Sequence, residues 1–286
     1  MSKTIRLSIP DWQAGNNPVY YFGAQLLNWL APKNQNQKTI QIPIVAPTKD
    51  NSKLLPENGV TAQSIVKRNV EMATKIINKE NPDKIITLGG NCLVSQAPFN
   101  YLHEKYGDKL GIIWIDAHPD ISTPEIFPNE HAMVLGNLLG KGDPQLAKLV
   151  KHPLAPESIL YVGLQELTPD EKDIMPSLGI NYQIEKNDQV DVDKIEKWIE
   201  KNGFEKIAIH FDLDVLDPNL FFDQFFNKPG VNDYGVSNGD LNPDKAISLL
   251  STLENDTEVV GLTIAEYLPW SALKLRELME KSQIFN

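Results

Sequence analysis

At 286 residues, with 41% hydrophobic and 23% charged residues, the chain has the composition of a globular protein and can form a large core. A formal net charge of -11 argues against a nucleic-acid partner, because such binding usually requires a basic surface. The single cysteine excludes an intramolecular disulfide framework, and no apolar stretch approaches the ~20 residues that a membrane span requires. The N-terminal residues lack the apolar segment and cleavage site of a secretory signal, so we expect a cytoplasmic protein without a membrane partner.

Short apolar runs alternate with helical patterns along the chain, which predicts an α/β fold. The predicted strands are Ile5 to Ile9, Ile40 to Val45, Lys84 to Leu88, Gly111 to Ile115, Ile159 to Gly163, Lys206 to Phe211 and Val259 to Ile264. The predicted helices are Tyr20 to Leu30, Thr61 to Asn78, Val94 to Tyr106, Glu130 to Leu139, Val192 to Lys201, Pro243 to Leu253 and Ser271 to Ser282. Several strands are apolar almost throughout, as expected when helices cover both faces of a parallel sheet. No linker or composition shift divides the chain, so we expect one domain over residues 1–286, with Phe221 to Gly235 as a loop.

Polar residues directly follow four of the predicted strands. These are the segment Gly-Gly-Asn-Cys ending at Cys92, the cluster Asp116-Ala-His118-Pro-Asp120, the cluster Asp212-Leu-Asp214-Val-Leu-Asp217-Pro218, and Glu266. In an open parallel sheet, ligands bind beyond the carboxyl ends of the strands. We therefore expect these residues to meet at one rim of the sheet.

The two acidic clusters have the donors of a metal site. Carboxylate oxygens and one imidazole suit Mn²⁺ or a similar divalent ion. Two ions held ~3.5 to 4 Å apart by bridging carboxylates would bind a hydroxide and lower its pKa, which provides a nucleophile at neutral pH. Either cluster alone is also consistent with an ordinary aspartate-rich turn, and Asp217 with Pro218 is better explained as a turn. The occurrence of both at strand ends favours a metal site.

The order of these motifs resembles the arginase, agmatinase and formimidoylglutamase family, the ureohydrolases, over almost the whole chain. The resemblance implies a three-layer α/β/α sandwich with a mostly parallel, eight-stranded sheet, assembled as a homo-oligomer, a trimer or a hexamer. It also implies two Mn²⁺ ions and hydrolysis of a C–N bond in a small-molecule guanidine or linear amidine, with metal-bound hydroxide as the nucleophile.

The resemblance also assigns ligands. Asp116 and Asp212 would bridge the metals, His118 and Asp214 would complete one metal, and Asp120 with the residue at position 92 would complete the other. Family members generally have Gly-Gly-Asp-His where this chain has Gly-Gly-Asn-Cys. A thiolate at Cys92 prefers zinc, iron or copper to manganese. Three interpretations stay open: a tolerated ligand swap, a weakened first metal with a mononuclear site, or a protein that has lost catalysis.

Two further positions resemble catalytic and substrate-binding residues of the family. His131 matches a histidine that shuttles protons or contacts the substrate, a role that suits an imidazole titrating near neutrality. Glu266 matches a glutamate that pairs with the guanidinium or amidinium group. His210 precedes the second cluster and is predicted to lie in the core or to support the site.

The substrate is less well defined than the reaction. Positions that recognise the amino-acid part of arginine in arginases correspond here to Ser122, Phe127 and Thr168, which argues against L-arginine. The aromatic segment Phe221 to Phe226 is consistent with a more apolar pocket, and equally with an exposed loop or an oligomer contact. Two other classes of function remain: a catalytically lost, metal-binding relative with a binding or regulatory role, and a two-metal amide deacetylase.

Overall fold

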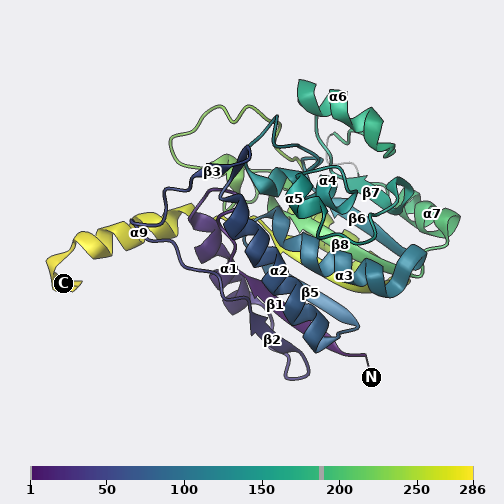
Figure 1. The fold of residues 1–286 in the computed structure, drawn as a ribbon, viewed down its shortest axis with the longest axis horizontal. Coiled ribbons are helices and arrows are strands. Elements are labelled where there is room, and N and C mark those ends of the chain that lie inside the picture. The colour runs from purple at the N-terminus through teal and green to yellow at the C-terminus, as the bar shows by residue number, and fades with distance from the viewer. Residues whose placement is uncertain (1, 187–189, 286) are drawn as a thin grey trace.

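The computed structural model describes residues 2–186 and 190–285, and its centre is a sheet of seven parallel strands (Figure 1). The strands run in the order β2-β1-β5-β9-β8-β6-β7. Their bounds are Thr4–Ile9 for β1, Lys38–Gln41 for β2, Lys84–Gly89 for β5, Leu110–Ile115 for β6, Ile159–Val162 for β7, Lys206–Asp212 for β8 and Glu258–Ala265 for β9. A separate antiparallel pair is formed by β3 (Pro56–Glu57) and β4 (Val60–Thr61).

Each predicted strand is present, and the α/β fold is confirmed. Strand β2 ends at Gln41 rather than Val45, because Pro43 has no N–H to donate and interrupts the ladder. Within the described residues the main sheet has seven strands, where the resemblance implies eight. The segment 180–186, beyond β7, forms no strand, although the N–H of Glu185 donates to the carbonyl of Leu164 at 2.9 Å.

Helices cover both faces of the main sheet and make the three layers. Their bounds are Val19–Leu30 for α1, Gln63–Glu80 for α2, Gln96–Tyr106 for α3, Val134–Leu138 for α4, Pro144–Ala147 for α5, Pro169–Leu178 for α6, Val192–Asn202 for α7, Pro243–Asp256 for α8 and Trp270–Lys281 for α9. Alternate residues of β6 point to opposite faces: Ile112 and Trp114 pack in the core shared with α2, α3 and α4, whereas Ile113 and Ile115 pack in the core shared with α7 and α8. Within the described ranges, no helix has the length and apolar character needed to cross a bilayer.

All seven predicted helices are found, two of them with a tighter first turn. A 3₁₀ turn over Cys92–Ser95 precedes α3, and another over Glu130–Met133 precedes α4. Helix α6 was not predicted because its sequence is mostly polar and includes an internal proline. Its start nevertheless has a capping box, in which the Thr168 hydroxyl and the Glu171 carboxylate each accept a backbone N–H of the other residue.

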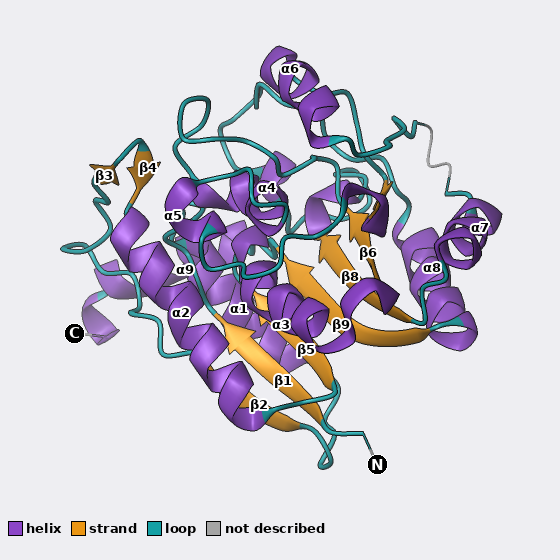
Figure 2. Cartoon of the chain, turned by 45° about the vertical axis from the view of Figure 1, so that its right-hand side comes forward, coloured by secondary structure: helices purple, strands orange, loops and turns teal. Residues whose placement is uncertain are grey.

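The parallel order brings the carboxyl ends of β5, β9, β8 and β6 to one rim of the sheet. Figure 2 shows the arrowheads of these neighbouring strands pointing the same way, toward the loops that carry α4 and α6. The residues expected to form the site follow these four strands. Helix α9 instead extends away from the rest of the chain (Figure 1).

Candidate metal centre

The carboxyl rim of the sheet contains a cavity of about 370 Å³ that collects most of the predicted site residues. Cys92 reaches it from the turn after β5, His118 and Asp120 from the loop after β6, Asp212 and Asp214 from the end of β8, and Glu266 from the end of β9. Ser122 and His131 also line it. Asp116 lies beneath the cavity, fully buried, and its carboxylate is 3.6 Å from the Nδ1 atom of His118. The structure therefore brings together every residue that the sequence assigned to the site.

The two acidic clusters are built in the same way at the ends of two adjacent strands. The Oδ1 atom of Asp116 accepts the backbone N–H of His118 at 2.7 Å, and the Oδ1 atom of Asp212 accepts that of Asp214 at 2.7 Å. In such an aspartate turn one carboxylate oxygen redirects the chain. The second oxygen has another partner: Asp116 Oδ2 accepts the indole N–H of Trp114 at 3.1 Å, and Asp212 Oδ2 accepts the Cys92 thiol at 2.9 Å. Strands β6 and β8 pair directly, so the two turns lie side by side.

Two residues at this rim have a backbone conformation that costs energy for residues other than glycine. Asp120 has φ 52° and Glu266 has φ 63°. Hydrogen bonds hold both in place: the carbonyl of Asp120 accepts the N–H groups of Leu135 and Gly136, and the N–H of Glu266 donates to the carbonyl of Gly90 at 2.8 Å. Strained positions that the surrounding structure enforces concentrate at functional sites, so this strain supports the assignment of the rim as a site.

Cys92 faces the acidic residues, whereas its neighbour Asn91 does not. The Cys92 thiol donates to Asp212 Oδ2 at 2.9 Å and lies 3.4 Å from Glu266 Oε1. Burial, together with the charge of Asp120, raises the pKa of this thiol well above its usual value. The amide of Asn91 instead donates to the side chain and carbonyl of Asp11, at 2.9 and 3.0 Å. Asn91 thus fixes the loop after β5, and only Cys92 enters the site.

His118 lies between the carboxylates and the cavity. Its Nδ1 atom is 3.1 Å from Asp214 Oδ2. Burial lowers the pKa of this imidazole, but the charge and hydrogen bond of Asp214 outweigh burial and raise it to about 10. Without a metal His118 is therefore a cation at neutral pH, and it must release a proton before it can act as a ligand.

The remaining acids lie close to one another in a buried place, which disfavours their charged forms. Burial raises the pKa of Asp116, Asp120 and Asp212 well above the usual range, and neighbouring carboxylates raise it further. Burial and the charge of Asp214 raise the pKa of Glu266 to about 8. None of the described residues lining the cavity is a lysine or an arginine.

Unpartnered oxygen atoms lie in the same place. Asp120 Oδ2 and Asp214 Oδ1 are buried without a hydrogen-bond partner. Candidate donor atoms of Asp116, His118 and Asp214 lie within 4.8 Å of one another, as do those of Cys92, Asp212 and Glu266. Buried carboxylates without cationic partners are costly unless a cation meets them. The donor set therefore fits divalent cations, with an oxygen and nitrogen position around His118 and a sulfur-containing position around Cys92.

His131 and Ser122 form part of the cavity wall opposite these acids. The Nδ1 atom of His131 lies 3.2 Å from the carbonyl of Ala14, and burial lowers the pKa of its ring to about 4. His131 is thus neutral at pH 7, and its role as a proton shuttle stays a prediction. The Ser122 hydroxyl is buried without a partner, so it is available to a ligand.

Sequence reasoning missed part of the cavity wall. Asp170 and Glu171, in the first turn of α6, line the cavity with Thr168. The Thr-Pro-Asp-Glu pattern is a helix-start signature that would have located this turn. Of the aromatic loop, Phe225 lines the cavity and packs on Tyr234 at 5.1 Å between ring centroids, whereas Phe221 packs on Tyr267.

Comparisons of sequence identify a family. The sequence profile described as the arginase family matches residues 30–274. The arginase of Entamoeba histolytica is 27% identical over 196 residues, which cover 66% of this chain and 64% of that protein. The arginase of Staphylococcus aureus strain COL is 28% identical over 163 residues, which cover 53% of this chain and 51% of that protein. The chain thus spans about half to two thirds of the length of these relatives.

Comparisons of structure extend the similarity to nearly the whole chain. The crystal structure of the Entamoeba histolytica arginase in complex with L-ornithine has a TM-score of 0.78 at 20% identity and covers 94% of this chain and 92% of that chain. The arginase from Bacillus caldovelox has a TM-score of 0.72 at 19% identity, with the same coverage. At these identities the likeness is one of fold.

Proposed function

The chain belongs to the arginase family, and we propose that it is a metal-dependent hydrolase of C–N bonds in a linear guanidine or amidine. The observation that carries this proposal is the arrangement of the carboxyl rim. Buried carboxylates without lysine or arginine partners lie below a cavity, and Glu266 reaches into the same cavity. Such a site suits both a cationic cofactor and a cationic substrate.

In this proposal the acidic clusters hold the metal. Asp116 and Asp212 would hold both metal ions, His118 and Asp214 would complete one position, and Asp120 and Cys92 would complete the other. The first of these has only oxygen and nitrogen donors, which suits Mn²⁺. When bound, the metal supplies a water of lowered pKa as the nucleophile.

The protein side chains around the cavity bind and orient the substrate. Glu266 would hold the guanidinium or amidinium group, because a carboxylate and a planar nitrogen cation form paired, charge-assisted hydrogen bonds. His131 lines the same cavity, and its imidazole would carry a proton to the departing amine. The unpartnered Ser122 hydroxyl would bind a polar group further along the substrate.

The wall of the cavity favours a substrate with an apolar part. Phe127, Phe225 and Val236 line the cavity, together with Thr168 and Ile126. A zwitterionic amino-acid end would meet these apolar groups and the carboxylates of α6. We therefore propose a guanidine or amidine other than L-arginine as the substrate.

Substrate screening tests the proposal. The protein is loaded separately with Mn²⁺, Fe²⁺, Co²⁺ or Zn²⁺ and assayed on arginine, agmatine, guanidinobutyrate and formimidoylglutamate for release of urea, formamide or ammonia. We expect Mn²⁺-dependent turnover of at least one of the last three. The Glu266→Gln variant, which keeps the shape but not the charge, should lose at least about a hundredfold in kcat/KM, or ~2.7 kcal/mol.

Other results would redirect the assignment. Metal binding without turnover across a broad guanidine and amidine panel favours the catalytically lost binding relative. Turnover of acetylated amines in place of guanidines favours a two-metal amide deacetylase. Turnover that is unchanged by Glu266→Gln contradicts the role given to this glutamate.

We also propose a cytoplasmic homo-oligomer, a trimer or hexamer, built from a single domain over residues 1–286. Helix α9 supports the assembly, since none of its side chains is buried within the chain and Leu275 and Leu278 are exposed. Sedimentation of the intact protein would test it, and a monomer at micromolar concentration would contradict it.

A further inference from the structure

His210 is a buried histidine next to the candidate metal centre, and one of its two ring nitrogens has no hydrogen-bond partner. It is fully buried in β8, and its Nε2 atom has no hydrogen-bond partner. The Nε2 atom lies 3.6 Å from Asp116 Oδ2, which is too long for a hydrogen bond. If His210 only packed in the core, both of its ring nitrogens would be expected to have hydrogen-bond partners. An unpaired buried polar atom costs about 1 to 3 kcal/mol of folding free energy.

The ring of His210 is held rigidly in this orientation. Its Nδ1 atom is 2.8 Å from the Ser95 hydroxyl, and its face stacks on Trp114 with ring centroids 3.8 Å apart and planes 11° apart. Trp114 is the cross-strand partner of His210 in β6, and its indole N–H also donates to Asp116 at 3.1 Å. When the Nδ1–H of His210 donates to the Ser95 hydroxyl, the lone pair of the ring lies on Nε2. A hydrogen bond at one ring nitrogen orients a histidine whose other nitrogen binds a metal in this way.

Three more donors surround the free nitrogen. One ligand atom each from Cys92, Asp116, Asp120 and His210 lie within 4.8 Å of one another, and all four residues are buried. One of these donors, Asp120 Oδ2, is also without a hydrogen-bond partner. A thiol, an imidazole and two carboxylates form a donor set of the kind that binds zinc, with four protein ligands around one centre.

We propose that the metal position at Cys92 is a zinc-class site in which His210 supplies the imidazole ligand, together with Cys92, Asp116 and Asp120. This inference deepens the proposed function and rests on it only for the chemistry of the neighbouring position. Position 92 has a cysteine where family members generally have a histidine, and the imidazole would come instead from His210 in β8, two residues before Asp212. The two positions then differ in kind: the one at Cys92 takes a thiolate-binding cation such as Zn²⁺, and the one at His118 takes a harder cation such as Mn²⁺.

Cobalt titration tests the site without any substrate. Metal-free protein is titrated with Co²⁺, the thiolate-to-cobalt charge-transfer band is recorded, and Zn²⁺ affinity is measured by competition. We expect the band in the native protein and in His118→Ala, which lacks only the imidazole of the other position. The band should disappear in Cys92→Ser. In His210→Ala, Zn²⁺ affinity at the position that gives the band should fall at least about tenfold.

X-ray absorption distinguishes a ligand from a supporting residue. The His118→Ala protein with one equivalent of Zn²⁺ should show one sulfur ligand and imidazole scattering, and the His118→Ala/His210→Ala protein should keep the sulfur and lose the imidazole signal. Imidazole scattering that persists in the double variant overturns the proposal. If removal of His210 prevents folding, the His118→Ala protein tests the proposal by itself. A zinc spectrum of that protein with a sulfur ligand and no imidazole scattering also overturns the proposal.

The outcome is separable from that of the proposed function. A protein that binds Zn²⁺ through Cys92 and His210 but hydrolyses no guanidine or amidine refutes the hydrolase and supports this site. Mn²⁺-dependent hydrolysis by a protein whose Zn²⁺ affinity and cobalt band are unchanged, within twofold, by His210→Ala supports the hydrolase and refutes this site.

Discussion

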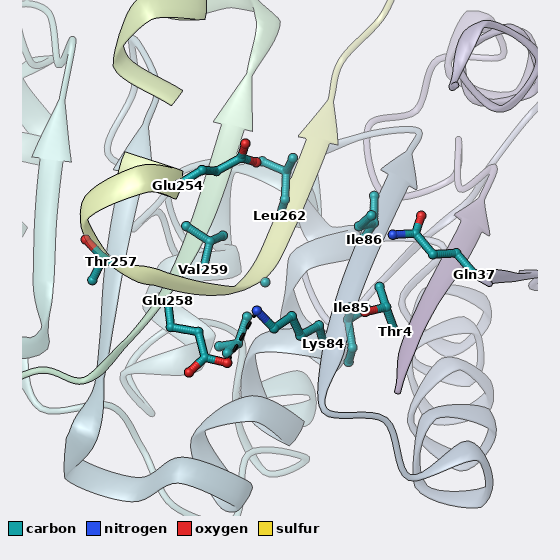
Figure 3. Close-up of a pocket in the computed structure, with 12 residues that line it drawn as sticks. Thr4, Gln37, Lys84, Ile85, Ile86, Glu254, Thr257, Glu258, Val259 and Leu262 are labelled. Atoms are coloured by element: carbon teal, nitrogen blue, oxygen red, sulfur yellow. Dashed lines mark ion pairs between the residues drawn. The ribbon is translucent and has the colours of Figure 1, made fainter. Parts of the chain in front are cut away.

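The two glutamates at the ends of strand β9, Glu258 and Glu266, have opposite electrostatic surroundings. Glu258 begins the strand beside a cavity of about 360 Å³ at the amino rim, where Figure 3 shows Lys84 reaching toward it. Their side chains form an ion pair at 3.3 Å, and Lys206 pairs with the other oxygen of Glu258. Glu266 follows the same strand at the carboxyl rim, buried among other acids.

The pKa values of these two glutamates shift in opposite directions. The hydrogen bond from Lys206 lowers the pKa of the exposed Glu258, whereas burial and the charge of Asp214 raise that of Glu266 to about 8. The cavities have similar volumes, but Lys84 lines the one at the amino rim, whereas no lysine or arginine is among the described residues that line the one at the carboxyl rim. Size alone therefore does not identify a functional site in this fold, whereas buried carboxylates without a lysine or arginine among the described lining residues do.

Neutralising one acid at the carboxyl rim should have the largest effect. Asp116→Asn removes a charge that both proposed metal positions use, and we expect kcat/KM to fall at least about a thousandfold, or ~4 kcal/mol. Asp217→Asn is the matched control, because Asp217 accepts the N–H of Asn219 in a turn outside the cavity. A loss of less than tenfold for Asp116→Asn would refute its role as a bridging ligand.

Adding metal should stabilise the protein through the carboxyl rim alone. At a concentration one hundred times Kd, Mn²⁺ should raise the free energy of unfolding by ~2.7 kcal/mol, measured by urea denaturation of protein freed of metal with a chelator. Glu258→Gln should show the same gain, and Asp214→Asn should lose most of it. An equal loss in both variants would mean that the two rims do not differ in this way.

Glu130, buried beside the site, should make stability depend on pH. Burial raises the pKa of Glu130 to about 8, above the value of 4.5 for an exposed glutamate. The folded state therefore binds an extra proton, so the stabilisation is complete below pH 4.5 and is lost as pH rises through about 8. Glu130→Gln keeps the acceptor for Asn137 and lacks this slope.

We expect the unfolding free energy of Glu130→Gln, relative to the native chain, to rise by on the order of 2 kcal/mol between pH ~5 and pH ~8. Urea denaturation of both metal-free proteins at the two pH values measures it. Parallel pH profiles for the two proteins would show that Glu130 is not protonated in the fold.

Breaking the ion pair at the amino rim should have the smallest effect. Lys84→Gln removes one partner of Glu258, and because both side chains are partly exposed and Lys206 remains, the free energy of unfolding should change by less than about 1 kcal/mol. Activity should be unchanged. A loss of activity would link the amino rim to the site and end the contrast between the two ends of β9.

The sequence by itself determined the strands and most helices, and it predicted which residues meet at the carboxyl rim. Apolar runs such as 111–115 are unambiguous because a parallel strand covered on both faces is apolar at every position. The acidic clusters could be placed at strand ends because the residues after such runs leave the sheet. Carboxylates and an imidazole at those strand ends then predict a site for a divalent metal ion at this rim.

Only the tertiary structure decided how these residues meet. Asn91 binds Asp11, which is 80 residues away, and His210 faces Asp116 because β8 pairs with β6. Period-two alternation places His210 on the face of Asp212, but it does not say which strand lies beside it. Strand order, and the lack of a lysine or arginine among the described residues around the site, arise from contacts between distant segments, and a local pattern cannot encode them.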